Sequence, residues 1–231
     1  MKPVCLVIGA GAGIGGTVGK RFAEEGYHSV LCRRSDQDGL NRLVAKIKED
    51  GGEATGFLLN AVTENAIEDR IAQIELEIGP IEVVVFNLGA QVGNRGLEET
   101  TYKVFELGWR MATFALFRTA SSVCPFMESR GKGTLLVTSS TAAVRGNAGQ
   151  HSHAAAMGGR RMLCQSLNAQ YASKGIHIAH IVIDGSVDAP DLSLGAGECD
   201  RELTAFAAAF YADALTQHGA GKVVSMQEQN V

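Results

Sequence analysis

Short apolar segments alternate with longer segments of helical periodicity along most of this 231-residue chain. The apolar runs lack strict polar alternation, which predicts strands that are buried on both faces of a sheet. The strand candidates are Val4–Ile8, Ser29–Cys32, Gly56–Leu59, Val83–Phe86, Leu135–Thr138, Ile178–Ile183 and Val223–Met226.

Helical stripes lie between these strand candidates. Apolar residues recur at helical spacing from Leu40 to Ile47 and from Ile67 to Ile78, and a longer stripe begins at Leu107. This alternation predicts an α/β fold, a doubly wound parallel sheet of Rossmann type with right-handed crossovers. No internal repeat or linker interrupts the alternation, so we expect a single domain over residues 1–231.

The region 189–218 departs from this rhythm. It contains a proline and two glycines, which predict a loop, and then a segment of helical character over 201–218. We expect this loop and helix to shape a substrate pocket within the domain.

Composition and charge exclude several classes of protein. The chain has 25 acidic and 21 basic residues, and its net charge of -4 leaves no basic excess for binding nucleic acid. The first apolar run, Val4–Ile8, is too short for a signal sequence or a membrane span. The five cysteines are widely spaced and form no C-x-x-C pair, which indicates free thiols in a reducing compartment. We therefore expect a cytoplasmic protein without a membrane partner.

A glycine-rich turn follows the first strand candidate directly and precedes a predicted helix. A helix N-terminus exposes unpaired N–H groups and a partial positive charge, and glycines let a pyrophosphate approach the backbone closely. The turn therefore predicts a dinucleotide site. Its residues are Gly9, Gly11, Gly13, Ile14 and Gly15.

Two arginines end the second strand candidate. An acidic residue at this place would accept hydrogen bonds from the ribose diol of NAD, but Arg33 and Arg34 stand there instead. Guanidinium groups suit the additional 2′-phosphate of NADP, so the sequence favours NADP over NAD.

The chain resembles the short-chain dehydrogenase/reductase family over residues 3–189. The glycine spacing is similar to that family's T-G-x-x-x-G-I-G, and Phe86-Asn87-Leu88-Gly89 is similar to its N-N-A-G. Residues 135–140 resemble the strand that ends in the catalytic serine, and Asp184-Gly185-Ser186-Val187 resembles the P-G-x-V turn. The resemblance implies an oxidoreductase that transfers hydride between a nicotinamide cofactor and a carbonyl or alcohol, and it implies a homodimer or homotetramer.

Site residues follow from the resemblance position by position. The glycine turn would hold the pyrophosphate, Asn60 would lie near the adenine, and Asn87 and Gly89 would support the cofactor side of the sheet. Val187 would face the nicotinamide carboxamide. Ser140 would hydrogen-bond the substrate carbonyl.

The sequence departs from the family pattern where proton transfer takes place. The family's tyrosine stands thirteen residues after the serine and its lysine four residues further on, but this chain has His153 and Met157 there. The asparagine that supports the lysine would fall near Ala112. An imidazole has a reference pKa of about 6.5 and can donate a proton without a lysine, so His153 is the candidate general acid or base. Met157 carries no charge.

The histidines His151, His153, His177 and His180 lack acidic or cysteine partners at metal-site spacing, so we expect no metal.

Three hypotheses remain open. The first is an NADP-dependent oxidoreductase in which Ser140 orients the oxygen and His153 transfers the proton. The second is a cofactor-binding relative that has lost catalysis and acts as a sensor or partner subunit. The third is a structural subunit with a vestigial cofactor site.

Overall fold

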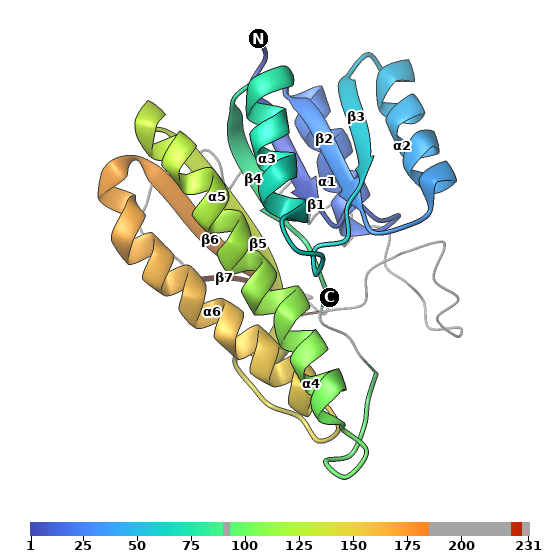
Figure 1. Cartoon of the computed structure of the whole chain (residues 1–231), viewed down its shortest axis with the longest axis vertical. Coiled ribbons are helices and arrows are strands. Elements are labelled where there is room, and N and C mark those ends of the chain that lie inside the picture. Colours follow the sequence, from blue (N-terminus) through green and yellow to red (C-terminus); the bar gives the residue numbers. More distant parts are fainter. Residues whose placement is uncertain (90–92, 185–222, 228–231) are drawn as a thin grey trace.

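A seven-stranded sheet forms the centre of the molecule, and its strands run in the order β3-β2-β1-β4-β5-β6-β7. Every neighbouring pair is parallel. The computed structural model shown in Figure 1 describes residues 1–89, 93–184 and 223–227. The strands are β1 (Val4–Ile8), β2 (His28–Arg33), β3 (Glu53–Leu58), β4 (Ile81–Phe86), β5 (Gly133–Ser140), β6 (Ile176–Asp184) and β7 (Val223–Gln227).

Helices cover both faces of this sheet. The α-helices are α1 (Ile14–Glu24), α2 (Gln37–Glu49), α3 (Ala66–Glu77), α4 (Tyr102–Trp109), α5 (Ala115–Arg130) and α6 (His151–Tyr171). A π-helix, η1 (Arg110–Phe114), joins α4 to α5, and 3-10 turns η2 (Thr141–Ala143) and η3 (Ala172–Lys174) flank α6. In Figure 1, α3, α5 and α6 lie along the same side of the sheet.

The two faces of the sheet form two separate hydrophobic cores. Successive side chains of a strand point to opposite faces. Accordingly Leu6 and Ile8 of β1 pack in the core beneath α3, α5 and α6, whereas Val7 packs in the core beneath α1 and α2. This double burial explains why the strands read as unbroken apolar runs.

The sequence predicted the fold class and all of these strands. The observed strands extend beyond several of the apolar runs; β3, for example, begins at Glu53 rather than Gly56, and β5 continues to Ser140. The longer helical stripe expected to begin at Leu107 is interrupted by the π-helix η1. The predicted loop and helix over 189–218 lie outside the described residues. None of the described helices is both long and apolar enough to cross a membrane.

The order of the strands determines where a ligand can bind. The chain runs outward from β1 through β2 to β3 and then returns to β4, on the other side of β1. In open α/β sheets, ligands bind at the carboxyl ends of the strands beside such a reversal. The glycine turn after β1 and the segment after β4 both lie at this position.

Candidate active site

The glycine turn brings the backbone of β1 against the segment that follows β4. Gly9 has a φ of +102°, a conformation that favours glycine, and a Cβ there would lie 2.6 Å from the Asn87 carbonyl oxygen. A Cβ on Gly15 would collide with the Gly9 carbonyl oxygen. The turn therefore needs glycine at both positions, and α1 begins directly after it with Gly13 as its N-cap.

Asn87 links the segment after β4 to the end of β1 and the start of the glycine turn. Its backbone N–H donates to Ile8 O at 2.8 Å, and its side-chain Nδ2 donates to Gly9 O at 3.0 Å. Asn87 thus holds the start of the glycine turn in place. By contrast, a Cβ on Gly11 would meet nothing within 4 Å, because Gly11 faces an open cavity.

This cavity, which we call the basic cavity, has a volume of about 280 Å³. Besides the glycine turn, its walls include the side chains of Lys20 from α1, Arg33 from β2 and Arg42 from α2. Arg33 forms an ion pair with Asp36 at 3.0 Å, and Lys20 forms one with Asp50 at 2.9 Å. Three cations around a helix N-terminus fit an anionic group such as a phosphate.

A second cavity, the serine–histidine cavity, has a volume of about 330 Å³ and contains the predicted catalytic residues. Ser140 ends β5 and His153 lies in the first turn of α6, and Ser140 Oγ is 3.2 Å from His153 Nε2. Asn87 and Gly89 line the same cavity. The structure therefore joins the predicted cofactor side and the predicted proton-transfer pair in one cavity.

Met157, which the sequence analysis aligned with the family's lysine, is buried, with 3% of its surface exposed. The Ser139 hydroxyl donates a weak hydrogen bond to its sulfur at 3.7 Å. Ala112, near which the family asparagine would fall, lies in η1 and is fully buried. Neither side chain can donate a proton or carry charge.

Arg160 is a residue of this site that the sequence analysis missed. It lines the serine–histidine cavity on the same face of α6 as His153 and Met157, and it is 1% exposed. Its guanidinium donates to Leu88 O at 2.7 Å, Thr138 O at 2.6 Å and Ala112 O at 3.2 Å. His153, Met157 and Arg160 are spaced at i, i+4 and i+7, which places them on one face of a helix. This spacing was the signal in the sequence that could have identified Arg160.

The structure separates the two arginines that the sequence analysis treated as one pair. Arg33 lines the basic cavity, whereas Arg34 lines the serine–histidine cavity. Lys20 and Arg42 join Arg33 in the basic cavity, and neither was predicted. Asn60 is exposed, and its side chain accepts from the Val62 N–H at 3.4 Å.

Val187 lies outside the described residues. Within the part of the chain that the structure describes, no three His, Cys, Asp or Glu side chains are grouped as metal ligands would be. The described cysteines are buried, and burial raises the pKa of the Cys32 thiol to about 12 and that of Cys164 to about 12. These thiols are therefore poor nucleophiles.

Known proteins share this fold. A short-chain dehydrogenase from Rhodopseudomonas palustris is 30% identical and superposes with a TM-score of 0.84, covering 97% of this chain and 98% of that one. The short-chain reductase protein NovJ of Streptomyces niveus is 31% identical over 194 residues, or 82% of this chain and 71% of the relative. A gluconate 5-dehydrogenase from Burkholderia cenocepacia J2315, solved with NADP and tartrate, has a TM-score of 0.73 at 24% identity and covers 78% of this chain and 70% of that one, which shows a shared fold.

The curated relatives are longer than the segment that matches. The alignments cover 66%, 71% and 72% of three of them, about two thirds of their length. The family model for short chain dehydrogenase matches residues 3–191, which include both cavities. The chain belongs to the short-chain dehydrogenase family of oxidoreductases.

Proposed function

We propose that the protein is an NADP-dependent oxidoreductase that interconverts a carbonyl compound and an alcohol. The observation that carries this proposal is the Ser140–His153 pair, 3.2 Å apart in a cavity that Asn87 and Gly89 also line. The pair supplies a hydroxyl and an imidazole at the end of the cavity where a substrate oxygen would lie. Membership in the family supports a nicotinamide cofactor and a small-molecule substrate.

The residues of the glycine turn fit such a cofactor. The backbone packs so closely at Gly9 and Gly15 that only residues without a side chain fit there. The open space beside Gly11 leaves room for a pyrophosphate at the N-terminus of α1. When bound there, the cofactor supplies or accepts a hydride.

Ser140 and His153 would act on the substrate oxygen. In the reductive direction, Ser140 Oγ donates a hydrogen bond to the carbonyl oxygen and orients it. The carbonyl carbon receives the hydride, and the protonated imidazole of His153 gives its proton to the oxygen, which becomes a hydroxyl. In the oxidative direction, neutral His153 takes up that proton. A positioned acid of this kind contributes about 10²–10⁴-fold to the rate.

The basic cavity supports NADP rather than NAD. Lys20, Arg33 and Arg42 surround a space beside the glycine turn, where a 2′-phosphate would form charge-assisted hydrogen bonds. Arg33 lines this cavity while it is ion-paired with Asp36. Asn60 remains our proposed neighbour of the adenine, and Val187 our proposed neighbour of the nicotinamide.

Two further assignments belong to this proposal. Residues 189–218 would form the variable part of the substrate pocket.

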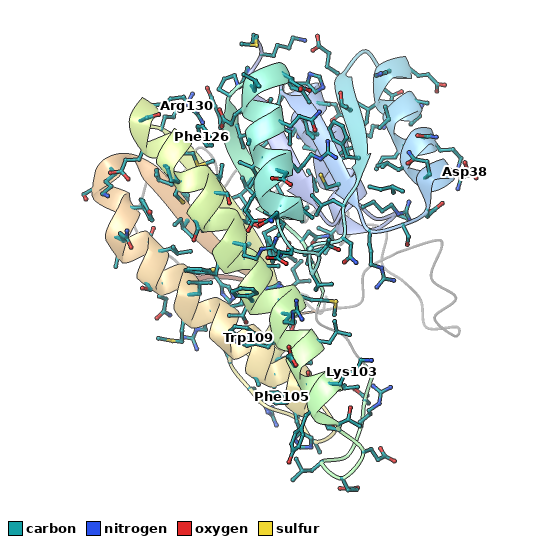
Figure 2. All side chains as sticks on the ribbon, in the orientation of Figure 1. Asp38, Lys103, Phe105, Trp109, Phe126 and Arg130 are labelled. Carbon is teal, nitrogen blue, oxygen red and sulfur yellow. The ribbon has the colours of Figure 1, made fainter. Side chains whose placement is uncertain are left out.

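A second copy of the chain would pack on α4 and α5, where several large apolar side chains are exposed, so we propose a homodimer or homotetramer. Figure 2 shows Phe105, Trp109 and Phe126 along this side of the molecule.

A second candidate function is a cofactor-binding relative that lacks catalysis and serves as a sensor or partner subunit. The observation that favours it is the thioether of Met157, buried where the family has a lysine ammonium. Such a protein would bind NADPH but would not oxidise it with any carbonyl substrate.

One set of measurements tests both functions. The purified protein is titrated with NADPH and with NADH by fluorescence, and NADPH oxidation is then followed across a broad panel of carbonyl compounds. Tight NADPH binding with turnover supports the oxidoreductase. NADPH binding without turnover supports the second candidate, in which case the double variant His153→Tyr with Met157→Lys is expected to generate activity. Binding of neither cofactor contradicts both.

A further inference from the structure

A buried guanidinium joins the segments that form the serine–histidine cavity. Arg160 lies on the inner face of α6, two turns beyond His153, and its guanidinium donates to backbone carbonyl oxygens from three different segments. Leu88 belongs to the segment after β4, Thr138 to β5 and Ala112 to η1. Each of these segments contributes to the site.

The three carbonyls have specific places relative to the functional residues. Leu88 lies between Asn87 and Gly89, the proposed cofactor residues. Thr138 precedes Ser140 by two residues on β5, so its carbonyl is held close to the end of the strand from which Ser140 projects. The guanidinium carbon also lies 5.1 Å from the centre of the Phe86 ring, directly before Asn87.

The π-helix places the third carbonyl. A π-turn widens the helix by one residue and changes the direction of its carbonyls, and such turns are frequent at functional sites. Ala112 O in η1 accepts from Arg160 Nε, and Thr113 Oγ1 donates to Ala156 O of α6 at 2.7 Å. The interruption of the long helix thus brings η1 into contact with the helix that contains His153.

Burying a guanidinium is expensive for a protein, and apolar side chains of similar size often give equal or greater stability. Arginine keeps its charge and offers a rigid planar set of donors, which suits it to hold several acceptors in a fixed geometry. A buried arginine such as Arg160 is costly for stability but well suited to fix three segments. We expect such a residue where the geometry of a site matters for function.

We propose that Arg160 is a positioning residue that links the cofactor segment after β4, the Ser140 strand and η1 to the helix that contains His153. The proposal rests on the proposed function for its catalytic consequence. Without Arg160, the segment 87–89 and the end of β5 are no longer held against α6. The Ser140–His153 distance and the placement of the cofactor then both vary.

Three variants test this role. Arg160→Met removes the charge and the hydrogen bonds to Leu88 O, Thr138 O and Ala112 O, and Arg160→Lys keeps the charge but can reach fewer carbonyls. The matched control is Arg130→Met, because Arg130 of α5 also links separate segments: it donates to Glu75 and to Ile81 O at 2.9 Å. Ile81 begins β4, so this link lies at the opposite end of the strand from Asn87, and Figure 2 shows Arg130 at the far end of α5 from Trp109.

The first readout is NADPH affinity together with kcat on a working substrate. We expect Arg160→Met to weaken NADPH binding about tenfold or more and to lower kcat by about 10- to 100-fold, as small misplacements of reacting groups do. Arg160→Lys should recover part of both losses. Arg130→Met should lower the midpoint of urea unfolding while NADPH affinity and kcat stay at the wild-type values.

The second readout is amide hydrogen exchange of the full chain without cofactor. We expect Arg160→Met to accelerate exchange at Asn87 and at residues 138–140, and Arg130→Met to leave these amides unaffected. The proposal is overturned if Arg160→Met binds NADPH normally with unchanged exchange there, or if Arg130→Met produces the same losses. If the wild-type protein binds no nicotinamide cofactor, the proposed function fails, and the exchange measurement alone decides the role of Arg160.

Discussion

Ser140 Oγ lies 3.2 Å from His153 Nε2, although a 3-10 turn and a loop separate the two residues in the chain. This contact places a hydroxyl and an imidazole side by side at the end of β5. We expect His153→Phe to lower kcat for NADPH-dependent carbonyl reduction by about 10²–10⁴-fold, because the ring can no longer transfer a proton. Ser140→Ala should also lower kcat, since the substrate oxygen loses its hydrogen-bond donor. Steady-state kinetics with saturating NADPH measures both effects.

The control for this prediction is His151→Phe. His151 begins α6 two residues before His153 and does not line the serine–histidine cavity. Its replacement should leave kcat unchanged. If His153→Phe turns over as fast as the wild-type enzyme, His153 is not the proton-transfer residue.

The basic cavity should distinguish NADPH from NADH. Arg33→Ala and Arg42→Ala are each expected to weaken NADPH binding about 10- to 100-fold, the value of a lost hydrogen bond between charged groups, with little effect on NADH. Lys48→Ala is the matched control, because Lys48 is an exposed cation of α2 outside the cavity. Titrations at one fixed ionic strength give the ratio of the two dissociation constants. Equal losses for NADH and NADPH would contradict the assignment of this cavity to a 2′-phosphate.

Two glycines of the turn should respond differently to alanine. A Cβ on Gly15 would collide with Gly9 O and approach Asn87 Nδ2 to 2.9 Å, so Gly15→Ala should lower the free energy of unfolding by about 1–3 kcal/mol. A Cβ on Gly11 would meet no atom within 4 Å, so Gly11→Ala should change stability by about 0.5 kcal/mol or less. It should nevertheless weaken NADPH binding, because the methyl group projects into the basic cavity. Urea unfolding and NADPH titration of both variants test this contrast, and normal NADPH binding by Gly11→Ala would contradict it.

The sequence predicted those parts of the structure that depend on local patterns. Strands such as Val4–Ile8 are buried on both faces and therefore read as unbroken apolar runs, and the glycine turn follows from its spacing. The resemblance assigned Ser140 and His153 to one active site, and in the structure their side-chain atoms lie within hydrogen-bonding distance; their catalytic roles stay predictions.

The sequence analysis missed those site residues whose place in a cavity depends on the rotation of a helix about its axis. Lys20 and Arg42 reach the basic cavity only because of the angular positions of α1 and α2. Arg160 was not singled out in the sequence; it is buried, and carbonyl oxygens from three distant segments accept from it. Arg33 and Arg34 were expected to act together, but successive residues at the end of a strand point in opposite directions and reach different cavities.

Exposed aromatic rings on α4, η1 and α5 predict self-association. The Trp109 and Phe114 rings stack at 5.3 Å and Phe114 stacks on Phe117 at 6.3 Å, and the Phe117 side chain is 50% exposed. A group of exposed aromatic side chains of this kind typically marks an interface between protein chains. We expect a dimer or larger species in sedimentation velocity at micromolar protein, and Phe117→Arg should shift it toward monomer. The control is Leu76→Arg, at an exposed apolar position on α3, which should leave the sedimentation coefficient unchanged. A wild-type monomer would contradict the prediction.

His180 should make the stability of the protein sensitive to acid. It lies in β6 and is 3% exposed, and neither ring nitrogen has a hydrogen-bond partner among the described residues. Burial, aided by the positive charges of Arg160 and Arg161, lowers the pKa of His180 to about 4 from an ordinary value of 6.5. Between these two pH values the unfolded chain binds the proton and the folded chain does not, so stability is lost as the pH falls from 6.5 to about 4. The contribution is at most about 3 kcal/mol.

His180→Leu should therefore flatten the decline in urea stability between pH 7 and pH 4, whereas Ile178→Val on the same strand should lower stability equally at both pH values. An unchanged decline in His180→Leu would show that other groups cause the acid sensitivity.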